Sequence, residues 1–201
     1  MKVNTNLDRT KLENTYYGMR HGFSRAQELG IIISDPKSGK LKKYGLTELG
    51  IGQALASAEK CQNLVPGTPI IVSSDFSRAM ETAAFARIRF GATQPYIAWQ
   101  LRERYFGIYE GTSNANYQKV WDGDKRDPDY HRHGGESVND VLDRLFLLIL
   151  LIEDRFSGGN IVLVSHGDPL KILECWFRGI NPRLHRSMRQ LKNAEIRRLS
   201  A

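Results

Sequence analysis

Two short apolar runs constrain the fold of this chain most, because each run leads through polar residues into a helical pattern. The runs cover residues 70–72 and 161–164. Apolar residues at helical spacing follow the first run: Phe76, Ala79, Met80 and Ala83. Strands that alternate with helices along a chain are typical of an α/β protein. We therefore expect an α/β fold.

The start signals of other elements agree with this expectation. We expect a first strand over residues 16–20 and an edge strand over residues 195–199. A helix is predicted to begin after Thr47, where Leu46 and Ile51 can form a hydrophobic staple. Another is predicted to begin after Ser137, which can act as its N-cap. The inner face of this second helix is expected to carry Val138, Val141, Leu142, Leu145, Ile149 and Ile152.

The strand over residues 161–164 also leads into a helix with recognisable ends. We expect Asp168 to be its N-cap and Pro169 its first helical residue. Gly179 and Pro182 are expected to end it, because glycine favours the position after a helix and proline cannot continue one.

Length and composition favour one domain over residues 1–201. The chain is 41% hydrophobic and 25% charged, which excludes a disordered or collagen-like chain. Residues 111–135 interrupt the alternation with a polar segment rich in Asp, Asn, Tyr and His. Because a loop of this length in a compact domain is usually functional, we expect a flap over a site.

The sequence also favours a cytoplasmic location. Its longest apolar run, residues 145–152, is too short for a membrane span, and residues 1–20 lack the apolar core of a secretion signal. The two cysteines, Cys61 and Cys175, fit a reducing compartment. We therefore expect no membrane partner.

The net charge of +7 is concentrated near the C-terminus. From Cys175 onward Glu195 is the single acidic residue, against a set of basic residues: Arg178, Arg183, Arg186, Arg189, Lys192, Arg197 and Arg198. No aromatic platform or nucleic-acid module accompanies this segment. We expect a solvated face or a surface that steers acidic substrates, and no nucleic-acid partner.

Four polar clusters lie where an α/β fold places its ligands, at predicted strand ends and helix starts. These clusters are residues 20–22, 73–78, 101–107 and 165–169. His21, His166, Arg20 and Arg78 would then converge at helix N-termini. Arginine forks match phosphate oxygens, and helix dipoles favour anions. The sequence therefore predicts an anion pocket.

The order of these clusters resembles the histidine phosphatase superfamily, the phosphoglycerate mutase-like group. The resemblance runs from about residue 16 to residue 173. It is carried by ordered motifs: Arg20-His21-Gly22, Leu46-Thr47-Glu48-Leu49-Gly50, Ser77-Arg78-Ala79 with Thr82-Ala83, Leu101-Arg102-Glu103 with Gly107, Gly134-Gly135-Glu136-Ser137-Val138, and Ser165-His166-Gly167. It implies a three-layer α/β/α sandwich with a mostly parallel central sheet.

The resemblance and the chemistry of the residues imply the same roles. His21 would attack phosphorus as a neutral imidazole and form a phosphohistidine. Arg20, Arg78 and His166 would stabilise the phosphoryl oxygens, so that no metal and no cofactor is required. Glu103 would protonate the leaving oxygen and then act as general base. Phosphate or substrate contacts are expected from Arg20, Gly22, Ser24, Gln27, Arg78, His166 and Gly167.

A second residue besides Glu103 could be the general acid. Glu103 could instead form a salt bridge with Arg102 or Arg104. A distant branch of the superfamily uses an aspartate directly after its second histidine as the acid, whereas here Gly167 intervenes before Asp168. Asp168 therefore remains the alternative acid, with a plain N-cap role as its other interpretation.

Other site residues also keep a second interpretation. His21 could be a strand-end histidine bonded to the backbone, and Arg78 could pair with Glu81 on its own helix. Gln27 stands where many members of the superfamily carry an asparagine, and with Ser24 it also fits a capping box.

The segment 111–135 contains further candidates. His131 and His133 could be a metal pair, but no acidic residue clearly completes it, so we expect flap surface and no metal site. Tyr117 and Trp121 either shape the substrate entrance or pack within the flap.

The function that we expect is a metal-independent phosphomonoesterase acting on a small phosphorylated metabolite. Phe106 replaces the tyrosine with which the mutases hold phosphoglycerate, and Phe23 stands where a polar residue is common. These departures disfavour the alternative of a cofactor-dependent phosphoglycerate mutase. A non-catalytic phospholigand-binding or interaction protein is the third alternative, and a homo-oligomer is compatible with the sequence.

Overall fold

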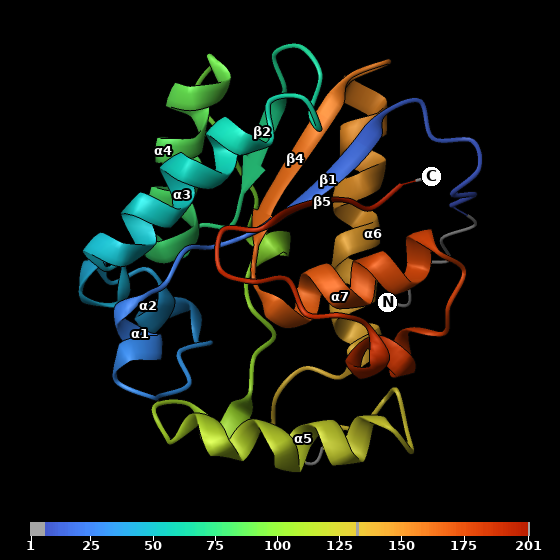
Figure 1. Ribbon diagram of the computed structural model, residues 1–201. Coiled ribbons are helices and arrows are strands. Elements are labelled where there is room, and N and C mark those ends of the chain that lie inside the picture. The colour runs from blue at the N-terminus through green and yellow to red at the C-terminus, as the bar shows by residue number, and fades with distance from the viewer. Residues whose placement is uncertain (1–6, 132, 201) are drawn as a thin grey trace.

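The computed structural model describes residues 7–131 and 133–200 and contains a five-stranded sheet (Figure 1). The strands are β1 (Thr15–Arg20), β2 (Ile70–Ser73), β3 (Tyr96–Ile97), β4 (Asn160–Ser165) and β5 (Ile196–Arg198). They lie in the order β3-β2-β4-β1-β5. Neighbouring strands are parallel, except that β5 pairs antiparallel with β1 at one edge. The expected mostly parallel sheet and its edge strand are thus confirmed.

The helices occupy the segments between these strands. The α-helices are α1 (Arg25–Glu28), α2 (Pro36–Gly39), α3 (Glu48–Lys60), α4 (Ser77–Phe90), α5 (Tyr117–Asp124), α6 (Val138–Arg155) and α7 (Gly167–Phe177). The 3-10 helices are η1 (Lys42–Tyr44), η2 (Trp99–Leu101), η3 (Gly107–Tyr109), η4 (Asn114–Asn116) and η5 (Pro182–Ser187). Within the described residues, none of these helices combines the length and apolar character needed to cross a membrane. Residues 1–6, part of the segment in which we predict no secretion signal, lie outside the described residues.

Two hydrophobic cores lie on opposite faces of the sheet, because successive side chains of a strand point to opposite sides. Tyr16, Ile161 and Leu163 belong to the core formed with α6 and α7. Tyr17 and Val162 belong to the core formed with α3 and α4. Figure 1 shows these two helix pairs on either side of the sheet. This arrangement confirms the three-layer α/β/α sandwich.

The register of the central strands places the C-terminal ends of β1, β2 and β4 next to one another at one end of the sheet. Arg20 lies opposite Ser165, and Ser73 lies opposite Val164. Strands β2 and β4 then lead within a few residues into α4 and α7. Because parallel strands end on the same side, the polar residues that follow them are placed next to one another.

Helix capping explains where two of the long helices begin. The Thr47 hydroxyl accepts a hydrogen bond from the backbone N–H of Gly50 at 3.1 Å, at the start of α3. At the start of α6, Ser137 and Asp140 form a reciprocal capping box. Both predicted N-caps are confirmed. Gly179, with a φ of +69°, follows α7 as expected of a terminating glycine.

One expectation about helix positions is wrong, and one residue at helical spacing lies outside the buried face. The N-cap of α7 is His166, not Asp168, so Pro169 lies within the first turn and not at its first position. Proline is tolerated throughout a first turn, because the N–H groups there have no partner within the helix. Met80 is 43% exposed. The buried face of α4 instead uses Ala79, Ala83 and Ala86, about 100° around the helix from Met80.

The segment over residues 111–135 is more regular than we expect from its polar composition. It contains η4 and the helix α5, which lies apart from both helix layers (Figure 1). Val120 of α5 is buried in a third apolar cluster with Ile32 and Phe106. A single buried aliphatic residue among polar ones gives too weak a helical pattern to be recognised in the sequence.

Candidate active site

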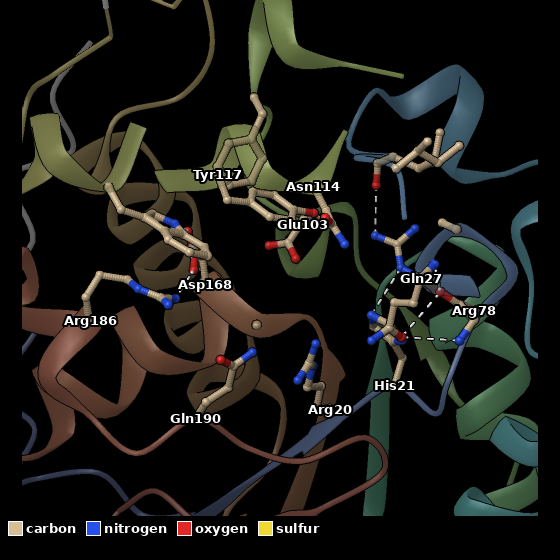
Figure 2. A pocket seen from close by; sticks show the side chains of 17 residues that line it. Arg20, His21, Gln27, Arg78, Glu103, Asn114, Tyr117, Asp168, Arg186 and Gln190 are labelled. Carbon is tan, nitrogen blue, oxygen red and sulfur yellow. Dashed lines mark hydrogen bonds and ion pairs between the residues drawn. The ribbon is translucent and has the colours of Figure 1, made fainter. Parts of the chain in front are cut away.

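A cavity of about 180 Å³ lies where the predicted clusters meet. Its wall includes Arg20, His21, Ser24, Gln27, Arg78, Glu103, Gly167 and Asp168. Figure 2 shows His21 and Arg78 on one side of this cavity, with Arg20 and Glu103 nearer to its middle. Of the predicted contact residues, Gly22 and His166 do not line the cavity directly.

His21 is buried, and its two ring contacts define its tautomer. Nδ1 lies 2.7 Å from the carbonyl oxygen of Gly22, and Nε2 lies 3.2 Å from Nε of Arg78. A carbonyl only accepts and a guanidinium only donates. The proton is therefore assigned to Nδ1, and the lone pair to Nε2. The expected alternative of a backbone-bonded histidine is realised at Nδ1 and leaves Nε2 for chemistry.

Burial, together with the charges of Arg78 and Arg20, holds the pKa of His21 well below its usual value. Removing an imidazolium from water is unfavourable, and two nearby guanidinium groups add like-charge repulsion. The ring is therefore neutral at pH 7.

Arg78 does not pair with Glu81, in contrast to the second interpretation of its sequence position. Besides His21, its guanidinium donates from Nη2 to the carbonyl oxygen of Ile33 at 2.9 Å. Glu81 instead accepts from the backbone N–H of Leu46 at 2.7 Å. The remaining nitrogen of Arg78, Nη1, is buried with no hydrogen-bond partner among the described residues.

Arg20 and His166 carry similar unpartnered nitrogens. Arg20 donates from Nη1 to the carbonyl oxygen of Leu191 at 2.9 Å, while its Nε is buried without a partner in the described chain. His166 lies 3.0 Å from the Ser74 hydroxyl through Nε2, and its Nδ1 is likewise buried and unpartnered there. The rings of His166 and His21 have their centroids 5.1 Å apart. Buried N–H donors without a partner are costly, so the unpartnered nitrogens of Arg20 and Arg78 favour a bound acceptor such as an anion.

Glu103 forms no salt bridge with its neighbours in the sequence. Arg102 pairs with Asp75, and Arg104 pairs with Asp124. Glu103 accepts one hydrogen bond, from the backbone N–H of Arg104 at 2.9 Å. Burial, with the nearby charge of Asp168 in second place, raises the pKa of Glu103 above its usual value. This carboxyl group therefore holds a proton more readily than an exposed glutamate.

Asp168 is buried in a charged cluster and does not cap a helix with its side chain. Its Oδ2 accepts from Nε1 of Trp121 at 3.0 Å, and its Oδ1 lies 3.7 Å from Nζ of Lys171. Burial favours the neutral acid, but its neighbours, His185 and Lys171 foremost, hold the pKa of Asp168 below its usual range. Of the two candidate acids, Glu103 is thus the one whose pKa is raised.

The backbone around His21 depends on a close approach of two glycines. A Cβ atom on Gly22 would lie 2.4 Å from the carbonyl oxygen of Gly50, and one on Gly50 would lie 2.1 Å from that of Phe23. Neither position leaves space for a side chain. The N–H of Gly22 donates to the Thr82 hydroxyl at 3.0 Å and so is directed away from the cavity.

Ser24 and Gln27 form the capping box of α1, which is one of the two interpretations of Gln27. Gln27 also lines the cavity, and its side-chain amide bonds to that of Asn193. Asn193 also donates to the carbonyl oxygen of His21 at 3.1 Å. The next residue, Ala194, donates its N–H to the same oxygen at 3.2 Å and has a φ of +60°. Sequence analysis missed these residues, because nothing in the C-terminal segment indicates that it returns to His21.

The far wall of the cavity comes from two segments that sequence analysis did not connect. Asn114, Tyr117 and Trp121 come from residues 111–135, while Arg186 and Gln190 come from the basic C-terminal segment. Tyr117 also packs on Trp121, with the two rings stacked 5.2 Å apart. Both interpretations of these aromatic residues, as cavity wall and as packing within the segment, therefore hold together.

The histidines of residues 131–133 do not form a pair on the surface. His131 is exposed, whereas His133 is buried and stacks on Tyr130. The expectation that both lie at the surface is wrong for His133, because the main chain around Gly107 and Gly135 closes over it. Among the described residues, no group of three or more His, Cys, Asp or Glu side chains is arranged to hold a metal ion. Arg132 lies outside the described residues.

Fold and site together define a class of protein. An α/β/α sandwich carries, at the end of its parallel strands, two histidines with ring centroids 5.1 Å apart, together with the buried Arg78 and the partly buried Arg20. The chain belongs to the histidine phosphatase superfamily (branch 1), whose sequence profile matches residues 17–201.

Individual relatives agree with this assignment. The chain is 33% identical over 150 residues to a glucosyl-3-phosphoglycerate phosphatase of Mycolicibacterium vanbaalenii, covering 67% of this chain and 64% of that protein. It is 26% identical over 141 residues to a 2,3-bisphosphoglycerate-dependent phosphoglycerate mutase of Methylocella silvestris, covering 66% of this chain and 68% of that protein. The solved structure of a mycobacterial glucosyl-3-phosphoglycerate phosphatase superposes with a TM-score of 0.73 at 26% identity, over 90% of this chain and 88% of that one. The chain thus spans slightly less than two thirds of the length of the first of these relatives.

Proposed function

We propose that this protein hydrolyses phosphate monoesters of small metabolites through a phosphohistidine on His21. The observation that carries the proposal is the lone pair of His21 Nε2, which lies 3.2 Å from Arg78 in a cavity lined by Arg20 and Arg78, each of which has a buried nitrogen with no partner in the described part of the chain. A tetrahedral phosphate bound there would supply the missing acceptors. The family membership and the phosphatases among the relatives support the same reaction class.

In the first step, Nε2 of His21 attacks the phosphorus atom. A bond forms between Nε2 and phosphorus, and the bond from phosphorus to the ester oxygen breaks. The alkoxide takes a proton from Glu103 and leaves as an alcohol. In the second step a water molecule attacks the phosphorus atom, and the Glu103 carboxylate takes a proton from this water. The bond from phosphorus to Nε2 of His21 breaks. Inorganic phosphate leaves, and His21 is neutral again.

The surroundings of each group suit its role in these steps. His21 is kept neutral by burial and by the arginines, so it is nucleophilic at pH 7. The arginines and His166 can stabilise the charge on the phosphoryl oxygens. Glu103, with its raised pKa, retains the proton that a poor leaving group needs.

A substitution of the nucleophile tests the proposal most directly. His21→Ala should abolish hydrolysis of a panel of phosphate esters, assayed with EDTA present, while the fold is retained. The wild-type protein, quenched in alkali during turnover, should carry an acid-labile phosphate that the variant lacks. His131→Ala, which removes an exposed histidine from the outer surface, is the matched control and should keep its activity.

Three outcomes would contradict parts of the proposal. Retention of more than a few percent of turnover in His21→Ala would refute covalent catalysis by this residue. Loss of activity in EDTA that zinc or magnesium restores would refute the metal-independent mechanism. Transfer of the phosphoryl group to a second phosphoglycerate, faster than to water, would assign the protein to the mutases that it also resembles.

A further inference from the structure

We infer that the end of the cavity opposite His21 is a second anion subsite, in which Arg186 binds a carboxylate group of the substrate. This inference rests on the proposed phosphatase function and specifies the class of its substrates. It predicts a phosphate ester whose other end carries a carboxylate.

The position of Arg186 indicates a role in ligand binding. Figure 2 shows Arg186 and Asp168 on one side of the cavity and His21 and Arg78 on the other, with Gln190 and Arg20 below the space between them. Arg186 belongs to η5, a segment separate from all elements that supply the phosphate end. A ligand that is held at His21 and fills the cavity would therefore extend toward Arg186.

The guanidinium of Arg186 is fixed before any ligand binds. Its Cζ lies 3.5 Å from the ring centroid of Trp121, and its Nη1 lies 3.4 Å from Oδ1 of Asp168. Trp121 is itself held by its hydrogen bond to Asp168 and by stacking on Tyr117. Stacking uses the face of a guanidinium and leaves its edge for hydrogen bonds. With 23% of its side chain exposed, Arg186 can still reach a ligand.

The charges around Asp168 leave Arg186 only partly neutralised. Arg104 forms a bidentate pair with Asp124, at 2.5 and 2.8 Å. Asp168 is then shared between Lys171, at 3.7 Å, and Arg186. Burial lowers the pKa of Lys171 only to about 8, so Lys171 stays mostly protonated at pH 7. Three cations thus face two carboxylates, and Arg186 is the exposed cation of this cluster.

One net positive charge and one arginine fork match a carboxylate better than a second phosphate. The phosphate end has Arg20, Arg78 and His21, whereas the end at Arg186 has one arginine with the neutral amide of Gln190 on the same side of the cavity (Figure 2). A guanidinium fork binds a carboxylate through two parallel hydrogen bonds. Ile31, Ile33 and Phe106 also line the cavity and provide apolar wall that suits a short carbon chain.

The test compares two ligands that differ mainly in this group. 3-Phosphoglycerate carries a carboxylate where glycerol 3-phosphate carries a hydroxymethyl group. Their dissociation constants are measured by titration calorimetry on His21→Ala protein, which should bind both without turning them over. We expect 3-phosphoglycerate to bind more tightly, and Arg186→Gln to reduce the ratio of the two constants by about 10-fold or more.

Arg183→Gln is the matched control, because it removes the same charge from an exposed position of η5 outside the cavity. Arg186→Lys, which keeps the charge and loses the fork, should give an intermediate ratio. An unchanged ratio in Arg186→Gln, or an equal change in Arg183→Gln, would overturn the subsite. Tighter binding of propane-1,3-diol bisphosphate, with a larger loss in Arg186→Gln, would overturn its assignment to a carboxylate.

Turnover of the two esters by protein with an intact His21 separates this inference from the proposed function. Hydrolysis of both esters with no effect of Arg186 on their binding ratio would refute the subsite alone. An Arg186-dependent preference in binding without hydrolysis of any ester would refute the phosphatase function alone.

Discussion

Nε of Arg78 lies 3.2 Å from Nε2 of His21, so the arginine expected to bind the phosphoryl group also binds the lone pair expected to attack it. A bound phosphate would replace this contact, because its oxygens are stronger acceptors than an imidazole nitrogen. We propose that Arg78 thereby orients the ring before the substrate arrives and stabilises charge afterwards.

Arg78→Lys should therefore remove more than a positive charge. Lysine cannot donate simultaneously to His21 and to the carbonyl oxygen of Ile33. We expect kcat/KM to fall by about 100- to 1,000-fold, the usual cost of losing a donor to transition-state charge. Steady-state kinetics on an aryl phosphate measures this loss, with circular dichroism as the check on folding. A loss of less than 10-fold would assign Arg78 a minor role.

Glu103→Gln should discriminate between leaving groups. An alkoxide needs a proton on departure and a nitrophenolate does not, so alkyl phosphates should lose about 100- to 10,000-fold more activity than the aryl ester. The comparison requires kcat for both substrate types in wild type and variant. Equal losses on the two substrates would mean that Glu103 is not the acid.

Asp168→Asn should act on the pH profile through Glu103. The charge of Asp168 raises the pKa of Glu103, and activity falls as pH rises through that pKa, because the acid must be protonated. Removal of the charge should move the basic limb of kcat/KM to lower pH. The acidic limb reports His21 and should not follow it. A selective loss on alkyl phosphates in Asp168→Asn would instead identify Asp168 as the acid.

The buried histidines should make the protein less stable in mild acid. The pKa values of His21 and His166 are depressed in the folded state, chiefly by burial. Below a pH of about 6.5 the unfolded chain therefore binds protons that the folded chain does not. The free energy of unfolding should fall with decreasing pH, by up to about 1.4 kcal/mol per pH unit for each histidine.

Urea denaturation at pH 7.0 and 5.5 measures this dependence. His166→Asn should show a smaller difference between the two pH values than wild type. His131→Gln, a change at an exposed position, should behave as wild type. A wild-type stability that is independent of pH over this range would show that the buried rings accept protons without cost.

Two glycines of α3 provide a matched pair for the packing around His21. A Cβ on Gly50 would lie 2.1 Å from the carbonyl oxygen of Phe23, whereas one on Gly52 meets no atom within 4 Å. Gly50→Ala should destabilise the fold by about 2 kcal/mol or more. Gly52→Ala should stabilise it by about 0.5–1 kcal/mol through helix propensity. Denaturant midpoints that shift in the same direction would contradict this assignment of the close approach.

The parts of the site that the sequence reveals are those with local signals. His21 and His166 stand directly after strands and Arg78 stands in the first turn of α4, so the strand and helix patterns also locate these residues. Glu103 follows the 3-10 helix η2 and is located by its sequence motif, Leu101-Arg102-Glu103 with Gly107. Asp168 stands in such a turn as well, but an N-cap and a buried ion-pair partner have the same sequence signature there. Its partner Trp121, 47 residues earlier, gives no sequence signal of this contact.

The C-terminal segment shows why the remainder of the site is not apparent from sequence. Its arginines look alike in the sequence, yet Arg178 pairs with Glu174 and Arg189 pairs with Glu195, whereas Arg186 turns into the cavity. These differences depend on how η5 and the following loop cross the sheet edge. Periodicity and composition carry no information about such a path.

The hydrogen bonds between His21 and the C-terminal segment can be lost while the rest of the molecule stays folded, so activity and folding can be lost separately. Asn193 and Ala194 bind the carbonyl oxygen of His21 although they are 172 and more residues away in the sequence. One residue, Glu195, separates them from the three-residue edge strand β5. Contacts of such sequence separation carry a high loop-closure cost, and short edge strands open at low free energy. Detachment of β5 would release the carbonyl oxygen of His21 from these contacts while α3, α4, α6 and α7 still cover the sheet. Most spectroscopic measurements would then report a folded protein, although the protein would be inactive.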